Sequence, residues 1–160
     1  VRAALVERHA VEPARAELLA HLSGGRVGWA ITHASDDSAL ERRAEILCEH
    51  RQLLGENRVA RFAYANALME ANKKDETAIS ETLEHWLSFW RDVMLVASGS
   101  AAPLTNVDFE DQLAVIASAV EAKRALQAVQ AIRETVHRRA RNVNTRLALE
   151  VLLLDLPRVR

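Results

Sequence analysis

The sequence predicts an all-α protein, and three observations lead to this prediction. Apolar residues recur three and four positions apart along most of the chain, and the alternation typical of half-buried strands is missing. Only five glycines and three prolines interrupt the 160 residues. Hydrophobic residues make up 49% of the chain and charged residues 27%, a balance typical of a helical globular protein with one good core.

Three short helices are expected in the first 35 residues. The first ends near Ala10, and the second begins around Pro13, because proline is well tolerated in the first turn of a helix. The sequence Ser23-Gly24-Gly25 ends the second helix, since glycine readily adopts the left-handed conformation found after helix C-termini. The third helix then carries three apolar residues, Val27, Ala30 and Ile31.

The polar stretch from Ser35 to Ser38 offers several N-cap residues, and we place a boundary between two structural units there. One helix is expected over 39–54, before Gly55, and another over 59–71. Cys48 falls on the apolar stripe of the first of these helices, so we expect a buried thiol.

The next helix, over 77–97, places Trp86, Phe89 and Trp90 on one face, which indicates core packing. A loop follows, and Asp108 is a plausible N-cap for the helix beyond it. Apolar residues then mark two helices with a bend between them near 120–123: Leu113, Ile116 and Val120, then Leu126, Val129, Ile132 and Val136.

The last helix is expected to begin at the N-cap Asn144 and to end before Pro157. Its leucines and its valine surround almost the whole circumference, a pattern that predicts burial on all sides. The helix is far too short to cross a membrane. Two explanations stay open: the helix lies at the centre of its own bundle, or another subunit covers its outer face.

Composition excludes several classes of protein. The net charge of −1 gives no reason to expect binding to nucleic acid or acidic membranes, and the single cysteine rules out an internal disulfide framework. The first residues, VRAALVERHA, include neither an initiator methionine nor a signal peptide. We therefore expect a piece of a longer protein from a reducing compartment.

Sites of metal or covalent chemistry are poorly supported. Glu134 and His137 provide one Glu-x-x-His step, whereas a di-iron bundle needs two such steps and further glutamates. Cys48 and His50 form no zinc pattern, because the chain has no other cysteine. A bundle metalloenzyme centred on Glu134 and His137 is the weakest of the functional hypotheses.

A basic segment, 123–146, is more informative. It contains seven lysines and arginines against two glutamates at 121 and 134, and no aromatic residues are interleaved with them. The segment could bind phosphates, but single-strand binders also need aromatic stacking platforms. A solvated face or a protein interface is the better explanation, and a nucleic-acid-binding module is kept as an alternative.

Two parts of the chain together resemble bacterial DNA polymerase III clamp-loader subunits. The segment HLSGGRVGWAI resembles the sensor-2 segment in the lid of AAA+ clamp-loader proteins. The segments WLSFWRDVMLVASG, LTNVD and NVNTRLALEVLLLDLP resemble the C-terminal collar domain, and the delta-prime type is the nearest. The resemblance implies a three-helix lid over 1–35, with the sensor-2-like segment at 22–31, and a collar of about five to six helices over 36–160.

The same resemblance bears on nucleotide binding. It places Gly28 where ATPase subunits of the family carry the sensor-2 arginine, and Arg26 two residues earlier would lie on another helix face. A delta-prime subunit does not hydrolyse ATP, so we expect no catalytic residue, nucleotide site, metal or cofactor here. The glycines are then turn and close-packing residues. A collar of the gamma/tau ATPase subunit is the runner-up within the family.

By resemblance, the collar joins the other loader subunits, delta and gamma/tau, into a pentamer. The full complex acts on the sliding clamp and primer–template DNA in the bacterial cytoplasm, at the replisome, with no membrane involved. We expect the last helix to contribute to the subunit interface, with basic residues at the rim. The predicted interface residues are Leu149, Leu152, Leu153, Leu156, Arg138, Arg139 and Arg146.

Overall fold

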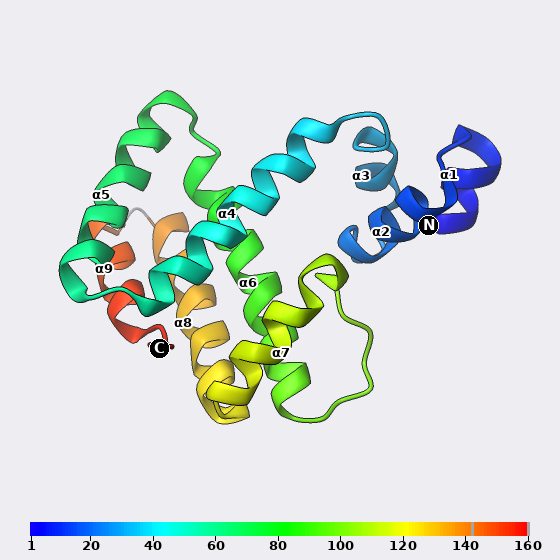
Figure 1. The fold of residues 1–160 in the computed structure, drawn as a ribbon. Helices are drawn as coiled ribbons and strands as arrows, with labels where there is room; N and C mark the ends of the chain where they lie inside the picture. Colours follow the sequence, from blue (N-terminus) through cyan, green and yellow to red (C-terminus); the bar gives the residue numbers. More distant parts are fainter. Residues whose placement is uncertain (142, 160) are drawn as a thin grey trace.

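A computed structural model describes residues 1–141 and 143–159, and within them it contains α-helices, one short 3₁₀-helix and no strand, as Figure 1 shows. The all-α prediction is therefore confirmed. The helices are α1 Arg2–His9, α2 Pro13–Leu22, α3 Val27–Thr32, α4 Asp37–Gly55, α5 Arg58–Lys74, α6 Ala78–Ala97, η1 Val107–Phe109, α7 Glu110–Ala119, α8 Ala122–Ala140 and α9 Thr145–Asp155.

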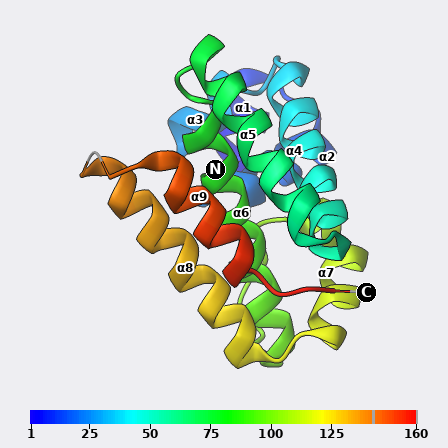
Figure 2. The ribbon, with the colours of Figure 1, turned by 90° about the vertical axis from the view of Figure 1, so that its left-hand side faces the viewer.

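Helix α6 is the centre of the larger part of the molecule. It packs against α4, α5, α7 and α8, while α9 packs on α5 and α8. Trp86, Phe89 and Trp90 of α6 are fully buried, which confirms their prediction as core residues. Figures 1 and 2 show α4 and α8 on opposite sides of α6.

The first three helices have a hydrophobic cluster of their own. Leu5, Ala16, Leu19 and Ala30 are fully buried in it, and Leu40 at the start of α4 packs against it from outside. The main cluster, which runs from Ile46 to Leu156, is separate. The described residues thus form two apolar cores: a small one in α1 to α3 and a large one in the later helices.

Polar contacts join the two parts. The Arg26 guanidinium lies 2.8 Å from the Glu84 carboxylate on α6, and the His21 ring lies 3.0 Å from the carbonyl oxygen of Leu104. Arg15 donates to the Ala34 carbonyl oxygen and pairs with Asp37 at the start of α4. These contacts are peripheral and partly exposed, so each stabilises the arrangement only modestly.

Helix ends follow the chemistry of the sequence. The side chains of Asp36 and Asn144 accept hydrogen bonds from the backbone of Ser38 and Leu147, which confirms both as N-caps. Gly24 and Gly25 have φ values of 54° and 89°, a conformation that side chains disfavour, and they follow the end of α2 as predicted.

The prediction that Asp108 caps a helix is wrong, because a buried arginine uses this carboxylate. Arg43 of α4 is 4% exposed, and it donates to Asp108 at 2.7 and 3.1 Å and to the Asn106 side chain at 2.6 Å. Asn106 in turn donates to the fully buried Asp92 of α6. This network fixes the loop before α7 on the central helix.

The predicted apolar face of α8 needs correction. Ile132 is buried, but Leu126 and Val136 are 41% and 45% exposed. Helix α8 buries four residues, Ala125, Ala128, Ile132 and Thr135. Two of them are alanines. Alanine lets α8 approach the bulky aromatic side chains of α6 closely, so its larger apolar residues are displaced to the side.

Arg61 of α5 ties three chain segments together. Its guanidinium donates to the carbonyl oxygens of Leu54, Leu153, Leu156 and Pro157 at 2.5 to 3.1 Å, and the residue is 5% exposed. These acceptors lie at the C-terminal ends of α4 and α9, where helix dipoles favour a positive charge. The backbone N–H of Val159 also donates to Leu54, at 3.1 Å.

Replacing Arg61 should destabilise the protein strongly. Arg61→Ala leaves three carbonyl groups without a donor and the Leu54 carbonyl with Val159 alone, and we expect the free energy of unfolding to fall by about 3 to 5 kcal/mol. Arg61→Lys should restore part of the loss, because an ammonium reaches fewer carbonyls than a guanidinium. Urea unfolding followed by circular dichroism measures the effect. The exposed neighbour Arg58→Ala is the control, and equal stability of the two alanine variants would contradict this role.

Candidate functional site

The four leucines of the predicted interface lie inside this chain. Leu149, Leu152 and Leu153 are each 1% exposed and Leu156 is 2% exposed, and all belong to the main hydrophobic cluster. Helix α9 packs them against α5 and α8. These side chains therefore have almost no surface to offer a partner, which agrees with the alternative that α9 is a core helix of its own bundle.

The expectation that α9 is buried on all sides is wrong, and its outer face is the informative one. Leu147, Val151 and Leu154 are 55%, 37% and 44% exposed, and their spacing places them opposite the buried leucines. Six of the nine large apolar side chains exposed in the described residues lie between 126 and 154. Exposed apolar side chains that gather on one part of a surface are typical of an interaction site.

We call this surface the α8–α9 face. It consists of the exposed apolar residues of the two helices and their connection: Leu126, Val136, Val143, Leu147, Val151 and Leu154. Figure 2 shows α8 and α9 side by side, and the two helices pack on each other. The sequence indicated an excess of apolar residues here, but it could not say which of them face inward.

The predicted basic rim residues have intramolecular partners. Arg138 lies 2.9 Å from Glu134, and Arg146 lies 3.0 Å from Glu150, both one helical turn away. Arg139 reaches the carbonyl oxygen of Glu76 at 3.4 Å. Exposed pairs of this kind contribute little to stability, so the arginines keep part of their capacity for another carboxylate or phosphate.

Two features describe the sensor-2-like segment, 22–31: the space around its glycines and the contacts of Arg26. A Cβ added at Gly24, Gly25 or Gly28 would meet no atom within 4 Å, so the expectation of close packing at these glycines is wrong. Gly28 lies inside α3, and the nearby Arg26 is engaged with Glu84 and with the carbonyl oxygen of Ser23. Arg26 thus joins the small core to α6.

Cys48 and His50, two residues apart on α4, lie in very different environments. Cys48 is exposed, which contradicts the prediction of a buried thiol, while His50 is fully buried. The two residues are separated by two positions on α4 and so lie on different faces. The face that turns toward α6 is the one with the histidine.

His50 is a neutral core residue. The indole N–H of Trp90 donates to its Nε2 at 2.8 Å, which puts the ring hydrogen of the neutral form on Nδ1. The ring also stacks on Trp86, with centroids 4.3 Å apart. Burial, together with a smaller effect of the Arg61 charge, lowers the pKa of His50 to about 3.

The residues named for a metal site, Glu134 and His137, lie one turn apart on α8 without a third potential ligand among the described residues. Glu134 pairs with Arg138, and no group of three or more potential metal ligands occurs in the part of the chain that the structure describes. Within the same residues, no helix has both the length and the apolar character needed to span a bilayer.

Comparison with known proteins gives one finding. The family model described as DNA polymerase III, delta subunit, C terminal, matches residues 40–158. The chain belongs to this family. No curated protein and no solved structure matches the chain.

The matched region begins in the first turn of α4 and includes every later helix. The α8–α9 face therefore lies within the C-terminal domain of a delta-family subunit of the clamp loader, a non-catalytic subunit of that complex. Helices α1 to α3 lie outside the match.

Adjacent leucines of α9 provide a direct test of which side is the core. Leu153→Arg puts an unpaired charge into the apolar interior, and we expect it to unfold the domain or to cost more than about 3 kcal/mol. Leu154→Arg places the same side chain on the outer face and should change stability by less than about 0.5 kcal/mol. Thermal unfolding of both variants decides between them. Similar losses in both would mean that the helix is oriented differently.

The buried histidine predicts how stability depends on pH. Its pKa is about 3 in the folded protein and 6.5 in the unfolded chain, so the unfolded state binds more protons between these values. Stability should be flat above pH 6.5 and fall as the pH drops below it, by up to about 1.4 kcal/mol per pH unit. Burial lowers the pKa of His85 to about 4, which adds a fall of the same sign.

His50→Gln keeps an acceptor for Trp90 and removes this titration. Denaturant unfolding between pH 7 and pH 5 should show a smaller slope for this variant than for the wild-type protein, and His9→Gln, at an exposed position on α1, is the control. Identical slopes for wild type and His50→Gln would contradict a neutral buried imidazole.

Proposed function

We propose that this chain is the C-terminal part of a delta-prime-type clamp-loader subunit, and that its helical domain assembles the loader without catalysing a reaction. Family membership supports the assignment to the clamp loader. The glycine at position 28 of the sensor-2-like segment, 22–31, argues against the gamma/tau ATPase type, which carries an arginine there. The likeness of residues 86–99, 104–108 and 142–157 to a delta-prime collar supports the finer assignment.

The division into lid and collar belongs to the same proposal. We assign residues 1–35 to an AAA+ lid and residues 36–160 to the collar. The separate hydrophobic cluster of α1 to α3 supports this division, as does the start of the family match at residue 40. Six helices, α4 to α9, then form the collar.

The α8–α9 face is our candidate for the contact with a neighbouring subunit. The single observation that carries this assignment is the concentration of exposed large apolar residues between 126 and 154. Burying them would remove apolar surface from water, which is the main driving force for association. The buried leucines of α9 support the face from within and do not touch the partner.

Basic side chains border this face. Arg138, Arg139 and Arg146 are held near it by their contacts with Glu134, Glu76 and Glu150. Arginine at the edge of an apolar patch suits bidentate pairing with carboxylates of a partner.

The partners in this proposal are the other loader subunits, delta and gamma/tau. The sliding clamp and primer–template DNA are reached through the whole complex. A direct nucleic-acid role for the segment 123–146 is the competing function, and it predicts binding by the isolated chain that falls steeply as salt is raised.

Assembly should depend on the α8–α9 face. Mixing this chain with the other loader subunits, followed by size-exclusion chromatography with light scattering, should give a complex of defined mass. Val151→Arg and Leu154→Arg should reduce its formation at least about tenfold, because each places a charge in an apolar contact. Val59→Arg, at a position 77% exposed on α5, is the matched control.

Two outcomes would overturn the proposal. A complex that forms equally well with Val151→Arg and Leu154→Arg would remove the α8–α9 face from the interface. A chain that joins no loader subunit, and instead shifts with DNA at low salt, would favour the nucleic-acid role of the segment 123–146.

A further inference from the structure

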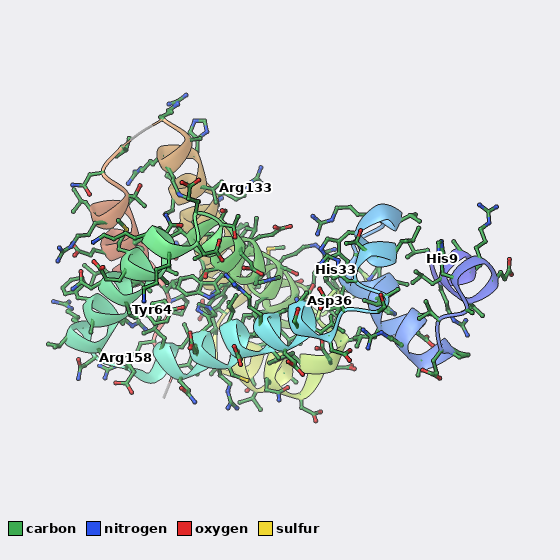
Figure 3. The ribbon with its side chains drawn as sticks, turned by 90° about the horizontal axis from the view of Figure 1, so that it is seen from above. His9, His33, Asp36, Tyr64, Arg133 and Arg158 are labelled. Atoms are coloured by element: carbon green, nitrogen blue, oxygen red, sulfur yellow. The ribbon has the colours of Figure 1, made fainter. Side chains whose placement is uncertain are left out.

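A second surface is an open groove between α4 and α5. Its two adjoining cavities have volumes of about 650 and 540 Å³, and both are lined by Glu49, Tyr64, Leu68 and Ala71. Both helices pack on α6. Figure 3 shows Tyr64 between the two helices. We call this surface the α4–α5 groove.

The two walls of the groove differ in chemistry. The α5 wall consists mainly of alanines spaced three and four residues apart, and the α4 wall and its end carry glutamates. Two cations also line the second cavity: Arg42, which is paired with Asp75 and Glu81, and Lys74. The alanines are Ala60, Ala63, Ala67 and Ala71, and the glutamates are Glu41, Glu45, Glu49 and Glu56. All but the half-buried Ala60 are exposed, whereas Leu53 and Leu68 are buried beneath them.

The glutamates of the groove have no cationic partner within the described residues. The ion pairs of α4 with later helices and loops join Arg42 to Asp75 and Glu81, and Arg43 to Asp108. The floor is also rigid, since the Tyr64 ring stacks on Trp86 with centroids 5.8 Å apart. Burial raises the pKa of the Tyr64 hydroxyl, and the carboxylate of Glu49 raises it further.

This combination fits one kind of occupant. An alanine wall leaves room for another helix to approach closely, and the spacing of three and four residues matches the ridges of a packed helix. A row of unpaired carboxylates attracts arginine or lysine and repels nucleic acid and acidic lipid. A metal ion is not indicated, because no group of three or more potential ligands occurs in the described residues.

We propose that the α4–α5 groove binds an amphipathic helix of a neighbouring loader subunit, with arginine or lysine facing the α4 wall and small apolar side chains facing the α5 wall. The inference rests on the proposed function, since it names a second surface of the same assembly. Helix α8 illustrates the chemistry required. It exposes Leu126, Arg133 and Val136 along one stripe, and Figure 3 labels Arg133 on it.

Two unlike surfaces on one subunit have a consequence for assembly. The α8–α9 face is apolar with a basic border, and the α4–α5 groove is apolar with an acidic wall. Subunits that join through unlike surfaces form rings or filaments and not isolated pairs. The groove therefore provides the contact to the second neighbour.

The test uses this chain with the other loader subunits and two groove variants. Ala67→Glu fills the alanine wall with a charge, and the double variant Glu45→Lys with Glu49→Lys reverses the acidic wall. Asn66→Glu and Glu17→Lys make similar changes at exposed positions outside the groove and outside the α8–α9 face. Circular dichroism should show that all four proteins fold, because every replaced side chain is exposed.

Light scattering of the mixtures then separates the outcomes. We expect the groove variants to form the complex at least about tenfold less well than the wild type, and both controls to form it normally. Normal assembly of both groove variants would overturn the groove and leave the proposed function intact. Failure of the wild-type chain to join any loader subunit would overturn the proposed function, and the groove inference with it.

Discussion

The Arg61 guanidinium is the interaction on which the domain's closure depends. It gathers the carbonyl ends of α4 and α9 and the residues after α9 at one point inside the protein. The charge is balanced by helix C-termini and not by a carboxylate. Without this donor, the carbonyl groups of Leu153, Leu156 and Pro157 would lose their partner, and only the hydrogen bond from Val159 to Leu54 would still join the chain after α9 to the end of α4. The position of α9 then determines which of its apolar side chains remain outside.

The exposed surfaces follow from this arrangement. Because α9 is fixed with four leucines inward, Leu147, Val151 and Leu154 remain in contact with solvent. Because α4 and α5 both pack on α6, a groove with one acidic and one alanine wall lies between them. The Arg43 network with Asp92, Asn106 and Asp108 holds the loop before α7 in place on α6. The packed interior thus presents two surfaces of different chemistry.

Much of this fold could be predicted from periodicity and caps, and the failures have a common physical cause. Helix positions, the Gly24–Gly25 turn and the aromatic core of α6 follow from local patterns. Arg43, Arg61 and His50 were missed because a polar residue on a helix normally indicates the solvated side, and only tertiary contacts reveal its partners. The exposure of Cys48 is the counterpart of the burial of His50. The outer face of α9 needed the three-dimensional packing, since apolar residues occur all around that helix.

A structure of the assembled loader containing this chain, obtained by electron cryo-microscopy, tests the central claim most directly. The account predicts that a neighbouring subunit covers Val151 and Leu154, while Leu152 and Leu153 stay inside this chain and Arg61 keeps its four carbonyl partners. A complex in which the outer face of α9 stays in contact with solvent, and the neighbours meet this chain elsewhere, would contradict the account.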